Sequence, residues 1–263
     1  MKMMVILLTI FLSFSNIEFK SYSCSSYILV QQGTNVILEG RDIYKTQSVA
    51  SVSKIMTAIL VIENYDLFET ITIDESVQKA YGSSIYLQQN DRITVMDLLY
   101  GLMLRSGNDA ALCLSMLFDD FVGMMNQKAK ELNMEYTTFS NPSGLDEEDE
   151  GNVSCVYDMA LLMSYALDND VFREIIGCRQ YKRLDGKGQW TNKNKLLFQY
   201  DDCIGGKTGY TKKAGRTLVT AARKKDMELI CVTFKESNDF QMHQDLYETY
   251  FKKHEYFYDL DTF

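Results

Sequence analysis

Apolar and polar residues alternate near the start of the chain and again in its last third, a period that is typical of β-strands. Residues 26–39 (SYILVQQGTNVILE) contain two such runs on either side of Gly33-Thr34-Asn35, which predicts a hairpin. Four more strand-like runs follow much later, at residues 178–184, 203–210, 215–223 and 227–235. Strands joined by short turns pair antiparallel. The strands near the start and those in the last third can also share one sheet.

The middle of the chain has helical spacing instead. Between Ala50 and Ile62, apolar residues recur at intervals of three and four residues, and this pattern predicts a helix. The same spacing predicts helices at residues 94–104, 108–117, 121–133 and 154–168, and an aromatic-rich helix at about 238–252. Residues 69–74 alternate like a short strand. We therefore predict an α+β fold in which an antiparallel sheet adjoins a helical lobe.

The first 23 residues have the character of an export signal. Lys2 precedes an apolar run from Met3 to Phe14, and Ser21-Tyr22-Ser23 lies where a signal peptidase would cut. A retained membrane anchor is the alternative, although so short a run spans a bilayer poorly. We predict a signal peptide over residues 1–23 and one domain over residues 24–263, with membrane association only if the first segment is retained.

Composition excludes several classes of function. The formal net charge is -9, and nucleic acid needs a basic surface, so we expect no nucleic-acid partner. The two histidines, His243 and His254, lie near the end of the chain, which disfavours a Ser-His-Asp triad or a histidine zinc site. We expect no metal and no cofactor. Of the six cysteines, Cys113 and Cys231 lie in apolar runs and are predicted to be core residues.

Ser51-Val52-Ser53-Lys54 is the first motif with chemical potential. Residues three apart share a helix face, so the Ser51 hydroxyl and the Lys54 amine can approach each other. A serine becomes nucleophilic when a nearby base takes its proton, and a lysine can be that base when burial or positive neighbours lower its pKa. The same four residues also suit an ordinary exposed helix face.

Two further motifs follow. Ser106-Gly107-Asn108 separates two predicted helices. There the Ser106 hydroxyl could relay a proton, and the Asn108 side-chain amide could bind a lysine or a carbonyl. A helix cap is the alternative. Lys207-Thr208-Gly209 lies in a strand-like run, where a cation and a hydroxyl suit a peptide carboxylate and the glycine allows close backbone approach. An ordinary hairpin is the alternative reading here.

The order and separation of the three motifs resemble those of penicillin-recognising serine enzymes. Their surroundings, SVSKIMTA (51–58), GSSIYLQQNDRITVMDLLYGLMLRSGNDAA (82–111), NPSGLD (141–146) and GGKTGYTKKAGRTLVTAA (205–222), resemble D-alanyl-D-alanine carboxypeptidases of the low-molecular-mass penicillin-binding type. The resemblance runs from about Tyr27 to Phe251. It implies the β-lactamase/transpeptidase-like form of the predicted α+β fold. It also implies a serine peptidase that removes the terminal D-alanine of peptidoglycan stem peptides in the cell wall, and β-lactams as covalent inhibitors.

The resemblance also implies a role for each motif residue in the acylation chemistry. Ser51 would attack the carbonyl between two D-alanines and form an acyl-enzyme. Lys54 would accept the serine proton, Ser106 would relay it, and Asn108 would hold both substrate and lysine.

The remaining implied roles concern substrate binding. Lys207 and Thr208 would bind the terminal carboxylate, and Gly209 would let the substrate backbone lie close. The backbone N–H groups of Ser51 and Tyr210 would form the oxyanion hole.

The chain departs from the family pattern at several places. Val49-Ala50 stands where a proline commonly precedes the serine, and Ser143 stands where a histidine is frequent. No arginine follows the strand that ends near Phe234, where relatives often carry one near the site. The further β-rich domain and C-terminal anchor of many relatives are not expected here.

Three alternatives share these motifs. A class A β-lactamase needs a glutamate-activated water, and residues 135–165 contain no Glu-x-x-x-Asn pattern; Gly107 also stands where those enzymes usually carry aspartate. An endopeptidase acting on D-Ala cross-links cannot be separated from a carboxypeptidase by sequence. An inactive peptidoglycan-binding homologue would have no use for the motif lysines.

Overall fold

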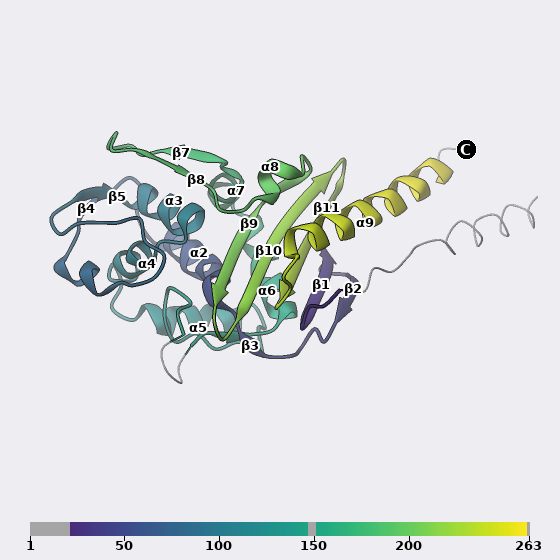
Figure 1. Cartoon of the computed structure of the whole chain (residues 1–263), viewed down its shortest axis with the longest axis horizontal. Coiled ribbons are helices and arrows are strands. Elements are labelled where there is room, and N and C mark those ends of the chain that lie inside the picture. Colours follow the sequence, from purple (N-terminus) through teal and green to yellow (C-terminus); the bar gives the residue numbers. More distant parts are fainter. Residues whose placement is uncertain (1–21, 147–150, 262–263) are drawn as a thin grey trace, which may run out of the picture.

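The computed structural model describes residues 22–146 and 151–261, and an antiparallel sheet of five strands forms its centre (Figure 1). The strands run in the order β2-β1-β11-β10-β9, so β9 lies at one edge. Their bounds are β1 Ser26–Gln31, β2 Ile37–Arg41, β9 Cys203–Thr211, β10 Gly215–Lys224 and β11 Met227–Phe234. Strands from the two ends of the chain therefore share one sheet, an arrangement that the alternating pattern allows, and β1 pairs with β11, with Leu29 opposite Cys231.

The strand alternation assigns side chains to two separate cores. Ile28 and Val30 of β1 point to one face and belong to a large core shared with the helices of the lobe. Leu29 points to the opposite face and belongs to a smaller core with Met242 and Tyr247. Because successive strand residues face opposite sides, one sheet can support helices on both faces.

A helical lobe lies beside the sheet, on the left in Figure 1. Its helices are α2 Lys54–Asn64, α3 Val95–Arg105, α4 Asn108–Ser115, α5 Phe121–Glu131, α6 Val156–Leu167 and α7 Asp170–Gly177. Thr94 caps α3 by accepting a hydrogen bond of 3.1 Å from the backbone N–H of Asp97. The helix α2 runs through the middle of the lobe and is buried along most of its length, which fixes the position of its first residue, Lys54.

The other face of the sheet is covered by α9, Asp239–Asp261, and by the short helix α8, Leu196–Gln199. His243 of α9 is fully buried there, with its two ring nitrogens 2.7 Å and 3.0 Å from the hydroxyls of Thr220 and Thr233. The α9 helix begins directly after β11, so its first turn lies at the same end of the sheet as the start of β10.

Smaller elements complete the chain. Three two-stranded ribbons and two 3₁₀ turns connect the helices: β3 Gln47–Ser48 with β6 Val153–Ser154, β4 Thr70–Thr72 with β5 Arg92–Thr94, β7 Gln180–Lys182 with β8 Gln189–Thr191, η1 Ala50–Ser53 and η2 Glu75–Lys79. The six cysteines, all within the described ranges, are unpaired. Cys113 and Cys231 are buried, as predicted.

The predicted α+β fold is confirmed, and the differences from prediction are local. The helix predicted from Ala50 begins as the 3₁₀ turn η1 and becomes α-helical only at Lys54. The final helix is longer than predicted, and α7, α8 and β8 were not predicted.

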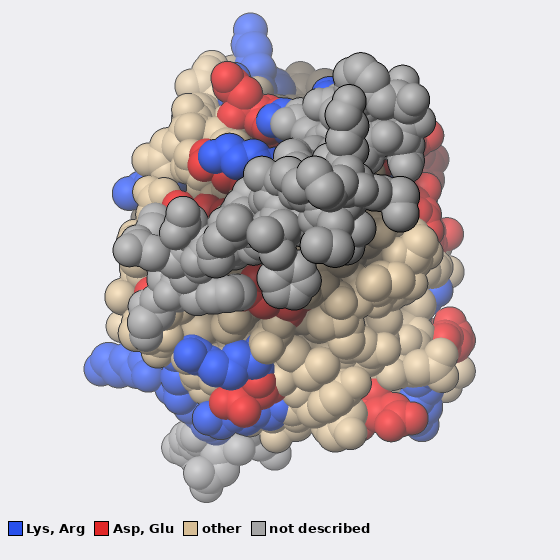
Figure 2. Space-filling view, turned by 90° about the vertical axis from the view of Figure 1, so that its right-hand side faces the viewer, with Lys and Arg blue, Asp and Glu red and all other residues tan. Residues whose placement is uncertain are grey.

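The predicted signal segment lies almost wholly on residues 1–21, outside the described residues, so it stays a prediction. Among residues 22–146 and 151–261, no helix combines the length and apolar character of a membrane span. Figure 2 shows the face at the right of Figure 1, where acidic and basic side chains lie interspersed around an uncharged area.

Candidate active site

Ser51 and Lys54 lie at the junction of η1 and α2. Ser51 is on the 3₁₀ turn, and Lys54 is the first residue of the α-helix. The Lys54 Nζ lies 3.0 Å from the Ser51 Oγ, within hydrogen-bond distance. Ala50, directly before the serine, has a φ of 51°, a conformation that is uncommon outside glycine. The structure therefore brings the first motif's two functional groups into contact.

Lys54 is fully buried, and its amine has two further acceptors. Its Nζ lies 2.8 Å from the Asn108 Oδ1 and also donates to the backbone carbonyl of Ser143. A neutral amine has two N–H groups and one lone pair. When Asn108 and Ser143 take the two N–H groups, the lone pair is left facing the Ser51 hydroxyl. The geometry thus suits a lysine that accepts a proton from Ser51.

The electrostatic environment favours that neutral form. Burial lowers the pKa of Lys54 well below its usual value of 10.5, and the positive charges of Lys207 and Lys193 lower it further, while Asp109 opposes the shift. An amine in such surroundings can act as a general base at much lower pH than an exposed lysine.

Ser106-Gly107-Asn108 is both a helix break and part of the site. Ser106 ends α3 in the left-handed conformation, with φ of 62°, and Gly107 precedes the first residue of α4. This tight break points the Asn108 side chain at Lys54, and its Nδ2 donates to the Tyr81 carbonyl at 2.6 Å. The motif therefore both forms a helix break and contributes side chains to the site.

Lys207 approaches Ser106 from the edge strand β9. Its Nζ donates to the Ser106 Oγ at 3.0 Å and to the Thr208 carbonyl at 2.7 Å. The side chain is 1% exposed, and burial together with the charge of Lys193 lowers its pKa to about 7. Lys207 therefore lies beneath the site surface, where it orients the Ser106 hydroxyl.

Gly209 allows β9 to pass close to the nucleophile. A β-carbon at this position would overlap the Thr217 Oγ1 and would lie 3.0 Å from the Ser51 backbone nitrogen. Thr217 in turn donates to the Val49 carbonyl at 2.9 Å, which ties β10 to the segment that leads into Ser51. The third motif thus lies directly against the first.

The three motifs open onto one cleft of about 500 Å³ between the lobe and the edge of the sheet. It is lined by Ser51, Ser83, Ser106, Lys193, Lys195, Thr208, Gly209, Tyr210, Arg216 and residues 237–240. The structure therefore brings together every site residue predicted from the sequence, with Lys54, Asn108 and Lys207 just below the surface.

Asp109 is a buried residue of this region that the sequence reasoning missed. Its carboxylate accepts hydrogen bonds from the Ser84 hydroxyl and from the backbone N–H groups of Ile85, Leu87 and Ala110, at 2.5–3.1 Å. These contacts fasten the segment that carries Ser83 to the start of α4. A carboxylate in the first turn of a helix was the available signal, but it also fits an ordinary helix start.

Asp146 is a second missed residue, and it joins three segments around the site. One carboxylate oxygen accepts from Ser48 at 2.6 Å, and the other accepts from Thr211 at the end of β9. The loop that ends at Asp146 also carries the Ser143 carbonyl that binds Lys54. Backbone groups carry no side-chain signature, so this acceptor could not be identified from the sequence.

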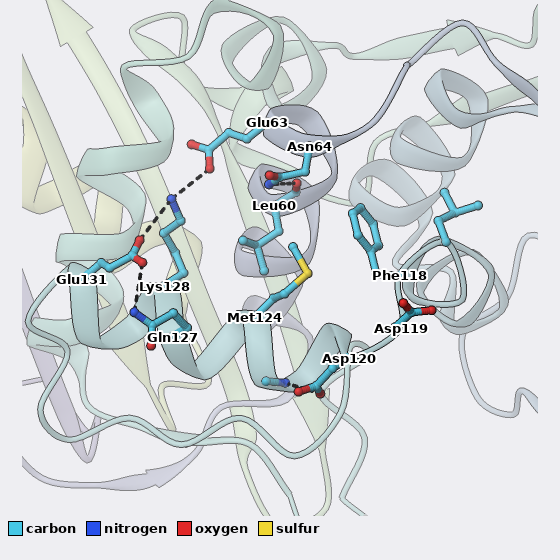
Figure 3. A pocket seen from close by; sticks show the side chains of 12 residues that line it. Leu60, Glu63, Asn64, Phe118, Asp119, Asp120, Met124, Gln127, Lys128 and Glu131 are labelled. Atoms are coloured by element: carbon cyan, nitrogen blue, oxygen red, sulfur yellow. Dashed lines mark hydrogen bonds and ion pairs between the residues drawn. The ribbon is translucent and has the colours of Figure 1, made fainter.

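A larger cavity of about 750 Å³ lies elsewhere, between α2 and α5 (Figure 3). Its lining contains no serine, and its lysine, Lys128, is bound to Glu63 at 3.0 Å and to Glu131 at 3.6 Å. A lysine held between two carboxylates keeps its proton, so this cavity has no base–nucleophile pair. Chemistry rather than size therefore identifies the smaller cleft as the candidate active site.

Comparison with known proteins gives one consistent family. The family model described as D-alanyl-D-alanine carboxypeptidase matches residues 15–238. The chain is 33% identical over 229 residues to the D-alanyl-D-alanine carboxypeptidase DacF of Bacillus subtilis, covering 82% of this chain and 58% of that protein. It is 31% identical to DacB2 of Mycobacterium tuberculosis, covering 78% of this chain and 72% of that protein. The chain thus spans less than two thirds of the Bacillus relative.

Solved structures agree with the sequence comparison. A D-alanyl-D-alanine carboxypeptidase from Mycobacterium tuberculosis superposes with a TM-score of 0.84 at 28% identity, covering 90% of this chain and 94% of that one. The Streptomyces K15 DD-transpeptidase gives a TM-score of 0.76 at 29% identity, covering 81% and 90%. The similarity therefore includes both the fold and the region that carries all three motifs.

Proposed function

Because this chain belongs to the D-alanyl-D-alanine carboxypeptidase family, we propose that it hydrolyses the terminal D-Ala-D-Ala bond of peptidoglycan stem peptides through an acyl-enzyme on Ser51. The observation that carries the proposal is the buried Lys54 amine, 3.0 Å from the Ser51 hydroxyl, with its other two acceptors on Asn108 and Ser143. This arrangement supports an activated serine without histidine.

Acylation begins when Lys54 takes the Ser51 proton and the serine oxygen attacks the scissile carbonyl. The oxyanion forms between the backbone N–H groups of Ser51 and Tyr210. The close approach of Gly209 to the Ser51 nitrogen supports this pairing. Preorganised donors of this kind are each worth roughly 3–4 kcal/mol of barrier.

Departure of D-alanine requires a proton on its nitrogen. Ser106 relays it, because its hydroxyl is held by Lys207 at 3.0 Å and opens on the same cleft as Ser51. Asn108 holds Lys54 in place. Thr208 binds the terminal carboxylate, and the positive charge of Lys207 beneath the cleft attracts it. Water then releases the shortened peptide, and Lys54 serves again as its base.

The same chemistry implies the partners and the place of action. β-Lactams would acylate Ser51 as substrate mimics, and the peptidoglycan stem peptide would be the natural partner. Such a substrate lies outside the cytoplasmic membrane, so we propose export by residues 1–23, with the domain acting in the cell wall or periplasmic space.

Two measurements on the purified protein test the proposal. Penicillin should add one penicilloyl mass to the intact protein and should add none to Ser51→Ala. Ser237→Ala, which changes another serine lining the cleft, should label like the wild type. The wild type and Ser237→Ala should release free D-alanine from a diacylated Lys-D-Ala-D-Ala peptide, and Ser51→Ala should release none.

The alternatives give different results in the same assays. Labelling that survives Ser51→Ala would refute the assigned nucleophile. Rapid clearance of penicillin without release of D-alanine would instead indicate a β-lactamase. A class A β-lactamase needs a carboxylate that activates water. Of the acidic run 146–150, Asp146 is the one member within the described residues, and its hydrogen bonds to Ser48 and Thr211 occupy both of its carboxylate oxygens.

A further inference from the structure

The cavity between α2 and α5 has no part in the chemistry proposed above (Figure 3). At about 750 Å³ it is larger than the candidate cleft, and it is lined by the last turns of α2, by residues 117–120 and by one face of α5. We call it the α2–α5 groove. Because its lining has no base–nucleophile pair, the function open to it is binding rather than catalysis.

The floor of the α2–α5 groove is apolar. Leu60 of α2 is 2% exposed there, whereas Leu117, Phe118 and Met124 pack on the core and leave part of each side chain accessible. Figure 3 shows Leu60, Met124 and Phe118 between the polar residues of the two ends. Accessible apolar side chains in a concave site favour an apolar ligand surface, because contact removes both from water.

Carboxylates lie at both ends of this floor. Asp119 and Asp120 precede α5, and Glu63 and Glu131 lie at the opposite end (Figure 3). The α5 helix has 11 residues, so the two ends are about 16 Å apart. Lys128, the one basic residue of the described lining, is bound to Glu63 and Glu131. The lining as a whole is therefore negative.

These carboxylates keep acceptor capacity for a cationic ligand. Among the described residues, no hydrogen bond or ion pair engages the Asp119 carboxylate. Asp120 uses its Oδ1 to cap α5 through the Gly123 N–H at 2.9 Å, and within the same residues its Oδ2 has no partner. At the other end, Glu131 is 51% exposed at its side chain. A basic group at each end of a ligand would therefore meet an acceptor.

The candidate cleft has the opposite charge. Its lining contains Lys193, Lys195 and Arg216, and its one described carboxylate, Asp239, is paired with Arg216 at 2.6 Å. A basic ligand is thus repelled by the cleft and attracted by the α2–α5 groove. Nucleic acid and anionic membranes carry phosphate groups, so the groove repels them. A small organic cation would reach only one of the two acidic ends.

The shape of the groove favours a helical ligand. Its sides are two helices, and a third helix can pack between two others by inserting its apolar side chains into their groove. A helix of about 11 residues matches the separation of the acidic ends. The ligand that fits is therefore a helix with an apolar face and basic residues at both ends.

We propose that the α2–α5 groove binds a basic amphipathic helix of a partner protein. Its apolar side chains contact Leu60, Phe118 and Met124, and a lysine or arginine at each end pairs with the carboxylates. The partner thus holds the domain by its helical lobe and leaves the cleft open, because no residue lines both sites. The inference does not depend on the proposed function.

The test uses a fluorescein-labelled peptide of about 14 residues, long enough to cover the groove, with leucines on one face and lysines at both ends. Fluorescence anisotropy should show saturable binding to the purified protein. A second peptide with glutamates in place of the lysines should bind at least about tenfold more weakly, because the carboxylates repel it. Equal binding of the two peptides, or no binding of the basic peptide, would overturn the inference.

Two double variants test the position of the binding site. Asp119→Asn with Asp120→Asn removes the carboxylates of one end, and asparagine at position 120 still caps α5. The affinity for the basic peptide should fall roughly threefold to thirtyfold, as for two exposed ion pairs. Asp42→Asn with Asp226→Asn is the matched control, since both residues are exposed, lie outside the groove and remove the same total charge. The control should change the affinity by less than about twofold. Equal losses in the two double variants would show a response to net charge alone and would refute the assigned site.

The apolar floor is tested separately. Met124→Gln keeps the length of the side chain but makes it polar, and it should weaken binding about fivefold or more. Met116→Gln, at a residue that is 50% exposed and outside the groove, should leave binding unchanged. A benzophenone on the leucine face of the peptide should cross-link to α2 or α5, as located by mass spectrometry. An unchanged affinity in Met124→Gln, or cross-links confined to other elements, would contradict the proposal.

Discussion

Replacing Asp109 by asparagine tests whether this carboxylate holds the site together. The aspartate accepts from four neighbouring residues, and Leu87 and Ser84 donate to its Oδ2 at 3.1 Å and 2.5 Å. An amide can keep its oxygen towards Ile85 and Ala110, but it then turns an NH₂ group towards the backbone N–H of Leu87. The Ser84 hydroxyl can rotate to accept, whereas the Leu87 N–H cannot.

The magnitude follows from that unpaired donor. Asp109 is 2% exposed, so the Leu87 N–H cannot find water in place of the carboxylate. One buried unsatisfied donor costs about 1–3 kcal/mol, and losing a charged acceptor weakens the remaining bonds, so Asp109→Asn should lose about 2–4 kcal/mol of unfolding free energy. For a chain of this length, that is roughly 4–8 °C in Tm.

The assay is urea unfolding followed by circular dichroism, with Asp120→Asn as the matched control. Asp120 caps α5 by accepting from the Gly123 N–H at 2.9 Å, and asparagine caps equally well, so the control should change by less than about 0.5 kcal/mol. If Asp109→Asn loses no more stability than the control, the reasoning is refuted.

Asp109→Asn should also change the pH dependence of acylation. The Asp109 charge raises the pKa of Lys54, so its removal lowers that pKa. The acid limb of the penicillin acylation rate, where Lys54 becomes protonated, should therefore move to lower pH. A limb that moved to higher pH would contradict the assignment of Lys54 as the base.

Three further predictions follow from the same geometry. The charge of Lys193 lowers the pKa of Lys54, so Lys193→Met should move the acid limb of acylation to higher pH, and an unmoved limb would count against it. Gly144 has a φ of 78°, and a β-carbon there would overlap the Ala50 carbonyl; Gly144→Ala should lose at least about 2 kcal/mol of stability in urea unfolding and also slow acylation. Burial lowers the pKa of His243 from 6.5 to about 3, so stability that is complete above pH 6.5 should fall towards pH 3. The slope due to His243 should approach about 1.4 kcal/mol per pH unit, should appear in the difference between the wild-type and His243→Asn curves, and should be missing from the variant itself.

Local geometry explains what the sequence could predict. Ser51 and Lys54 are three residues apart, so any helical turn places them on one side, whether 3₁₀ or α. Thr94 and Ser106-Gly107 mark the two ends of α3 by ordinary cap chemistry. The antiparallel hairpins followed from strand alternation and from the short turns that join neighbouring strands, whereas the direct pairing of β1 with β11 was not predicted.

Long-range contacts explain what it could not predict. The Ser143 carbonyl meets Lys54 across 89 residues of chain, and a backbone acceptor has no residue signature. Arg216 and Asp239 are 23 residues apart, and nothing in their local sequence distinguishes them from solvated surface charges. The missed helix α7 did carry a signal, because Asn169 caps it and an acidic residue follows.

The position of β9 at the edge of the sheet has a consequence for stereochemistry. A peptide that pairs with this edge is held by main-chain groups that every amino acid shares, so pairing alone does not read the handedness of a residue. A mirror-image residue differs in the side of the peptide ribbon on which its methyl group stands. The preference for one enantiomer therefore depends on the two sides of the cleft, which are formed by the helical lobe and by the first turn of α9. Altering that preference would require changes in those two sides rather than in the strand.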